Sequence, residues 1–126
     1  MAQKNSQQLH LTINCIQADW LSAIANHSLD LIVSNPPYIA RFDEHLAKLA
    51  YEPISALVAD ENGMADIHIL CGQAFQKLKP SARLYIEHGY DQEQAVVTAF
   101  EGSGFTNVIC HYDYAGLPRF TSGIKP

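Results

Sequence analysis

The hydrophobic pattern of this chain predicts strands that alternate with helices. Residues 29–34 form a nearly continuous apolar run, which is typical of a strand buried on both faces of a parallel sheet. Residues 12–18 alternate in polarity and are rich in β-branched side chains, which predicts an earlier strand. Further strands are predicted over residues 82–87, 107–112 and 119–124, the last of which closes a terminal hairpin.

Helices are predicted between these strands. Over residues 64–78 apolar side chains recur every three or four positions, and Pro80 lies just past the end of this pattern. A second helix is predicted to start at Asp91, whose carboxylate would cap the first turn while Gln94 reaches back, and to end at Gly102. The remaining segments are expected to be short helical turns at 3–9 and 21–26 and a surface loop at 41–60.

This order of elements predicts a mainly parallel α/β sheet with helices on its faces. Ligands of such sheets bind beyond the carboxyl ends of the strands. In this chain those ends fall at Asp19-Trp20, at residues 35–38 and at residues 87–89. We therefore expect the functional site at these three places.

Composition and charge narrow the class of protein. The chain has 126 residues, of which 48% are hydrophobic and 17% charged, and this suits one globular domain. Eight basic against thirteen acidic residues give a formal net charge of −5, which argues against extended contact with a nucleic-acid backbone. No apolar run reaches about 18 residues, and the N-terminal ten residues are polar, so we expect no membrane span and a cytoplasmic location.

The cysteines and histidines do not indicate a metal centre. The cysteines, at positions 15, 71 and 110, are odd in number and lie in apolar sequence, which favours buried thiols over disulfides. The five histidines other than His88 show no metal-ligand spacing.

Asn35-Pro36-Pro37-Tyr38 is the strongest functional signal, because it directly follows a buried strand. Two prolines fix two backbone φ angles and remove two N–H donors, so the turn presents hydrogen-bond acceptors in a preset geometry. The Asn35 side chain and the Asn35 and Pro36 carbonyls can accept hydrogen bonds from an incoming NH2 group, beside the flat face of Tyr38. The alternative is a tight turn that ends in a core tyrosine.

Asn-Pro-Pro-Tyr at the end of a buried strand resembles the substrate motif of S-adenosylmethionine-dependent amino-methyltransferases. Further stretches occur in the order found in HemK-type peptide chain release factor glutamine methyltransferases: Asp19-Trp20, Tyr51-Glu52-Pro53, Gly63-Met64-Ala65-Asp66, Glu87-His88-Gly89-Tyr90, Asp113-Tyr114-Ala115-Gly116 and Arg119. The resemblance covers essentially the whole chain. It implies a Rossmann-like class I methyltransferase fold, with residues 1–126 as the C-terminal portion of one domain and an antiparallel hairpin at its end.

The resemblance also implies a substrate. The family methylates the side-chain amide nitrogen of the glutamine in the Gly-Gly-Gln loop of class 1 release factors, which are the expected partners. Asn35, Pro36, Pro37 and Tyr38 would hold this amide, and Asn35, Pro36 and Tyr38 would act on the reacting nitrogen. Glu52 would shape the wall of the substrate pocket.

For the cofactor, the resemblance implies that Asn35 and Trp20 border S-adenosylmethionine and that Asp19 lies near its adenine amino group. The family's glycine-rich cofactor loop has no counterpart, because the close pair Gly102 and Gly104 follows a helix and predicts a C-cap. We therefore expect an incomplete fold without its first strands, weak binding of S-adenosylmethionine by this chain, and a sheet edge exposed to pairing with another copy.

Two other functions remain open at this point. An adenine amino-methyltransferase acting on DNA or RNA uses the same tetrapeptide on a flipped base, although the charge of −5 speaks against it. A non-catalytic fragment is the third hypothesis. His88 is expected to shape a loop, and the terminal hairpin is expected to be held by Tyr112, Asp113, Tyr114 and Arg119.

Overall fold

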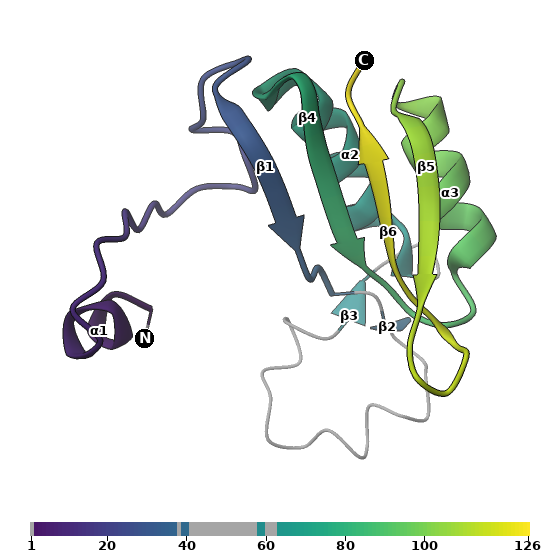
Figure 1. The fold of residues 1–126 in the computed structure, drawn as a ribbon, viewed down its shortest axis with the longest axis horizontal. Helices are drawn as coiled ribbons and strands as arrows, with labels where there is room; N and C mark the ends of the chain where they lie inside the picture. Colours follow the sequence, from purple (N-terminus) through teal and green to yellow (C-terminus); the bar gives the residue numbers. More distant parts are fainter. Residues whose placement is uncertain (1, 38, 41–57, 60–62) are drawn as a thin grey trace.

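A four-stranded sheet with two helices on one face forms the body of the protein (Figure 1). The computed structural model describes residues 2–37, 39–40, 58–59 and 63–126. The elements in chain order are α1 (Ala2–Gln8), β1 (Leu29–Ser34), β2 (Ile39–Ala40), β3 (Val58–Ala59), α2 (Ala65–Lys77), β4 (Leu78–Glu87), α3 (Glu93–Gly102), β5 (Thr106–Tyr112) and β6 (Pro118–Ile124).

The sheet has the strand order β1-β4-β6-β5. β1 pairs with β4 in parallel, whereas β6 lies antiparallel between β4 and β5. β1, β4 and β5 therefore point the same way and β6 runs back between them. This confirms the predicted α/β class, with a Rossmann-like parallel pair and an antiparallel hairpin at the end of the sheet. The short strands β2 and β3 form a separate parallel pair.

The core lies between the sheet and helices α2 and α3. The apolar positions of α2 face the sheet, and Ile67, Leu70 and Cys71 are buried there. From the strand side, Leu84 and Ile86 of β4 are fully buried, as their alternation predicted. Burial of a side chain of this size contributes about 1.5–3 kcal/mol. The covered face of the sheet is therefore the main source of the stability of this fold.

The opposite face of the sheet has no covering element in the described part of the chain (Figure 1). Leu31 and Val33 of β1 are 53% and 72% exposed on it, and Ile109 of β5 is exposed on the same face at the other side of the sheet. Phe120 of β6 lies on the same face, against Tyr85 at a centroid separation of 6.3 Å. This open face is therefore largely apolar.

The strand predicted over residues 12–18 is wrong. Residues 11–17 form no regular element and are exposed, because no strand in the described part of the chain lies alongside them. Alternating β-branched residues stabilise a strand only where a neighbour pairs with them. Cys15, in this segment, is consequently exposed rather than buried, whereas burial of Cys71 raises the pKa of its thiol to about 12.

The predicted start of the second helix is also wrong in detail. α3 begins at Glu93, and its N-cap residue Gln92 makes no side-chain capping bond. The Gln92 side chain instead accepts a hydrogen bond from the backbone N–H of Gly89 at 2.8 Å, which holds the turn that precedes the helix. The segment predicted as helical at 21–26 forms turns, and the predicted loop at 41–60 lies largely outside the described residues.

Two negative findings apply to the described residues alone. None of their helices combines the length and the hydropathy that a membrane crossing requires. They also contain no group of three or more His, Cys, Asp or Glu side chains placed to hold a metal ion.

Gly123 permits the close packing of α3 on β6. An ideal Cβ at Gly123 would lie 2.7 Å from Cδ1 of Phe100, which is fully buried, whereas a Cβ at Gly72 on the exposed side of α2 would meet nothing within 4 Å. We therefore expect Gly123→Ala to lower the free energy of unfolding by about 1–3 kcal/mol. Gly72→Ala should raise it by about 0.5–1 kcal/mol. Urea unfolding of the two variants checks this, and equal midpoints would contradict it.

Candidate functional site

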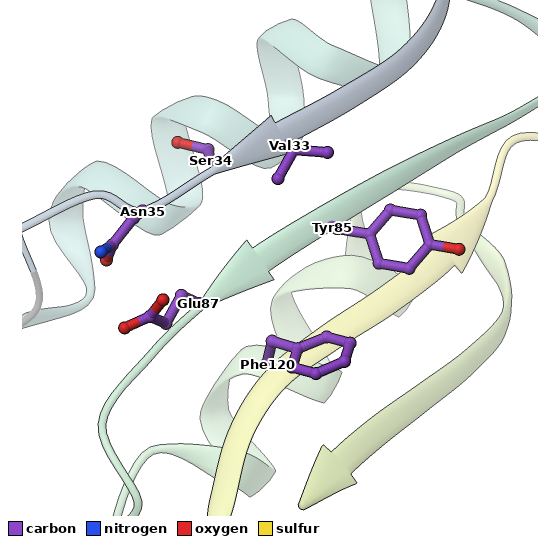
Figure 2. Close-up of a pocket in the computed structure, with 6 residues that line it drawn as sticks. All are labelled: Val33, Ser34, Asn35, Tyr85, Glu87 and Phe120. Carbon is purple, nitrogen blue, oxygen red and sulfur yellow. The ribbon is translucent and has the colours of Figure 1, made fainter. Parts of the chain in front are cut away.

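The carboxyl ends of β1 and β4 open into a cavity of about 470 Å³ on the uncovered face of the sheet. Figure 2 shows its lining: Val33, Ser34, Asn35, Tyr85, Glu87 and Phe120. The Asn35 amide and the Glu87 carboxylate lie at its polar end, where the two strands stop, and the rings of Tyr85 and Phe120 line the rest. The cavity therefore combines an apolar floor with hydrogen-bonding groups at one end, as binding sites commonly do.

Asn35 stands where the chain leaves the sheet. Its predecessor Ser34 pairs with Ile86, so Asn35 emerges beside Glu87. Asn35 is exposed, Pro36 is buried and Pro37 is half-buried. A buried proline with a fixed φ angle anchors the turn, while the amide of Asn35 remains accessible from solvent. Asn35 is thus open to a ligand rather than sealed in the core.

The structure brings only part of the predicted site together. Asn35 lines the cavity, whereas Asp19 and Trp20 do not. Trp20 packs against the core with a backbone φ of 49°, and the next residue, Leu21, donates its N–H to Gln73 Oε1 on α2 at 2.8 Å. The Asp19-Trp20 turn is therefore fixed to α2. The predicted substrate residues Tyr38 and Glu52 lie outside the described residues.

His88, directly after β4, is fully buried and holds two strands together. Its Nδ1 lies 2.9 Å from the Gly89 carbonyl and its Nε2 lies 2.9 Å from Oγ1 of Thr121 on β6. Because a carbonyl only accepts, Nδ1 carries a proton and donates it to Gly89, while Nε2 lies within hydrogen-bonding distance of the threonine hydroxyl. Its backbone N–H also donates to the Arg119 carbonyl at 2.9 Å. Both ring nitrogens are satisfied, which agrees with the loop-shaping role that the sequence predicted.

The turn between β5 and β6 is organised by Asp113. Its Oδ1 accepts hydrogen bonds from the backbone N–H groups of Ala115 and Leu117, at 2.8 and 3.0 Å. Its Oδ2 accepts from Nε of Arg119 at 2.7 Å. These donors, the Arg119 guanidinium first, hold the pKa of the Asp113 carboxyl below its usual value of 3.8. The predicted role of Asp113 and Arg119 in holding the hairpin is confirmed.

Sequence reasoning missed the apolar part of the cavity. Alternation along β4 placed Tyr85 on the face opposite Leu84, but it did not show that this face stays open. Phe120 joins Tyr85 because β6 is inserted next to β4, with Glu87 and Phe120 as register partners. The alternation was the available signal for Tyr85, whereas the sequence contains no local signal for the order of the strands.

The buried hydrogen bonds of His88 yield a stability prediction. We expect His88→Leu to lower the free energy of unfolding by about 1–3 kcal/mol for each buried partner left unsatisfied. The matched control is His68→Leu on the exposed side of α2, which should stay within about 0.5 kcal/mol of the original protein. Denaturant midpoints at a common slope measure both. A harmless His88→Leu would show that the two ring bonds do not stabilise this edge.

None of the protein-family models matches the chain. Release factor glutamine methyltransferases of Salmonella typhimurium, Bordetella pertussis and Escherichia coli are 43%, 39% and 41% identical to it, in each case over 98% of this chain. The matches cover 46%, 47% and 46% of those proteins, so the chain spans about half the length of the curated relatives it matches.

Two solved structures share the fold. One is a Thermus thermophilus protein provisionally assigned as a DNA modification methylase, with a TM-score of 0.56 and 19% identity over 84% of this chain and 50% of that one. The other is a Bordetella parapertussis protein provisionally described as exported, with a TM-score of 0.51 and 18% identity over 86% of this chain and 43% of that one. At these identities the likeness concerns the fold alone. By sequence, the chain is a relative of the release factor glutamine methyltransferases and spans about half of their length.

Proposed function

We propose that this chain provides the acceptor-binding part of an S-adenosylmethionine-dependent methyltransferase that acts on the side-chain amide of a glutamine in class 1 release factors. The observation that carries the proposal is the placement of Asn35, exposed at the end of β1 and followed by the buried Pro36, at the mouth of the cavity. The identity of about 40% with release factor glutamine methyltransferases supports it. In this proposal residues 1–126 are the C-terminal portion of one methyltransferase domain.

The acceptor site must overcome the low nucleophilicity of an amide nitrogen, whose lone pair is delocalised into its carbonyl. Asn35 Oδ1 and the backbone carbonyls of Asn35 and Pro36 would accept hydrogen bonds from the two amide N–H groups. Two such bonds orient the nitrogen and favour its pyramidal form. Their partial negative charges also stabilise the positive charge that grows on the nitrogen during transfer. No side-chain base is required before the transfer, because the proton is lost once the nitrogen is alkylated.

Tyr38 and Glu52 belong to the same proposal on sequence grounds. The Tyr38 ring beside the reacting nitrogen would contribute a cation–π interaction of about 0.5–2 kcal/mol in a dry pocket. Pro37 would keep Tyr38 directed toward the acceptor, and Glu52 would close the pocket wall.

S-adenosylmethionine, when bound, supplies the methyl group. The described residues fit part of this cofactor, since Asp19 is exposed and Trp20 offers a half-buried aromatic ring in a turn fixed to α2. They do not supply a glycine-rich loop between a strand and a helix, which is the usual cradle for such a ligand. We therefore propose that Asp19, Trp20 and Asn35 border the cofactor and that this chain alone retains only weak affinity for it.

Methylation of a release factor would take place in the cytoplasm, which is the location expected from the sequence. Nucleic acid is the less favoured substrate. The net charge of −5 does not favour binding to a phosphate backbone. The methylase-like structure from Thermus thermophilus shares only the fold.

Transfer of a tritiated methyl group from S-adenosylmethionine tests the proposed reaction. We expect incorporation into a purified class 1 release factor and none into DNA, with the upstream half of the relatives supplied if the chain alone is silent. Asn35→Ala should lower the turnover number by about a hundredfold or more, because it removes an acceptor aimed at the developing charge. Asn14→Ala, an exposed amide outside the cavity, is the matched control. Labelling of DNA alone, or an unimpaired Asn35→Ala variant, would contradict the proposal.

We also propose that copies of this chain associate through the sheet. In the described part of the chain β1 has no neighbour on its outer edge, and Leu31 and Val33 are exposed on the open face. An open edge beside an apolar face favours pairing with another chain. Sedimentation velocity should show a concentration-dependent oligomer that Val33→Lys shifts toward the monomer. A compact monomer at high concentration would contradict this.

A further inference from the structure

The turn of the β5–β6 hairpin, residues 113–117, lies at the same end of the sheet as Asn35, where β1 and β4 have their carboxyl ends. β5 ends at Tyr112 in the direction in which β1 ends at Ser34, so the turn and the acceptor site share this end (Figure 1). We propose that the turn is a docking point for the folded protein that supplies the acceptor amide, with Tyr114 and Leu117 as its anchors. This inference rests on the proposed function, and it adds a contact remote from the reacting atoms.

The turn is rigid before any partner arrives. Besides its three side-chain bonds, Asp113 donates its backbone N–H to the Leu117 carbonyl at 2.8 Å, and its own carbonyl accepts from the N–H of Gly116 at 3.0 Å. Gly116 has a φ of 77°, a conformation that glycine adopts without strain. A preorganised turn loses little conformational entropy on binding, which favours affinity.

Two side chains of the turn expose apolar surface to solvent. Tyr114 is fully exposed, at 113% of its reference area, and Leu117 is 40% exposed. Tyrosine offers a large amphipathic contact area with few rotatable bonds, and it is enriched among the residues that dominate protein–protein binding energy. The internal bonds of the turn all run through Asp113, so Tyr114 is not needed to hold it.

The distance between the turn and Asn35 determines how large a substrate must be to contact both. Strands lie about 4.8 Å apart, and the turn between β6 and β5 is more than two strand spacings from β1, which places it about 10–15 Å from Asn35 along the edge. A glutamine side chain seated at Asn35 does not extend that far. A folded protein does, because a standard interface buries about 800 Å² on each partner. Extended chain spans about 3.3–3.6 Å per residue, so roughly three to five residues are needed to bridge this distance. The anchors therefore act on a protein that carries the glutamine and not on a glutamine flanked by only one or two residues.

Steady-state methylation of two substrates tests the docking point: a folded class 1 release factor, and a capped Gly-Gly-Gln tripeptide, which is too short to reach the turn. With the release factor, Tyr114→Ala should raise KM about tenfold and leave kcat within twofold. With the peptide, both constants should be unchanged. Tyr114→Phe, which keeps the ring, and Ile69→Ala, an exposed apolar residue on α2, should behave like the original protein. Asp113→Asn should raise KM for the release factor by loosening the turn.

The results separate this inference from the proposed function. Failure of the unmodified protein to methylate either substrate, even with the upstream half of the relatives supplied, overturns the function. An unchanged KM for the release factor, or an equal rise with both substrates, overturns the docking point alone. The dissociation constant of the release factor, measured by titration without turnover, gives an independent comparison in which Tyr114→Ala should again weaken binding about tenfold. A variant that changes only the self-association of the chain would also overturn the docking point.

Discussion

The parallel pairing of β1 with β4 is the constraint on which the site depends. Because the two strands point the same way, they end side by side, and Ser34 is the register partner of Ile86. Asn35 and Glu87 consequently leave the sheet at the same edge. If the pairing were antiparallel, the two side chains could not meet at one cavity, because the strand ends would then lie at opposite ends of the sheet.

The inserted strand β6 contributes further groups to the same end of the sheet. It pairs with β4 so that Phe120 lies opposite Glu87, and it continues from a turn that Asp113 holds. His88 joins the end of β4 to Thr121 of β6 from inside the core. One antiparallel strand thus contributes a wall to the cavity, a partner to a buried histidine and the base of an exposed turn. A change in its register would disturb all three.

Much of the architecture could be predicted from local patterns. Residues 29–34 form a strand with the predicted bounds, but this strand is buried on one face and not on both, since Leu31 and Val33 are exposed. The apolar residues of α2 face the core as their spacing indicated. The strand predicted at 12–18 failed because its propensity needs a partner that the described residues do not include. The cavity could not be predicted either, since Tyr85 and Phe120 are 35 positions apart and meet only through the order of the strands.

The two faces of the sheet have different roles: the covered face stabilises the fold, and the open face lines the cavity. Among the described residues, the core cluster lies between α2, α3 and the covered face and includes Ile32 of β1, and Pro36 is buried just beyond the end of this strand. The open face contributes the floor of the cavity but little burial. The geometry of the acceptor turn therefore depends on the covered face. A segment or partner packed over the open face would change access to the cavity and the dielectric constant around it. It would not change the position of Asn35, which the pairing of β1 with β4 sets.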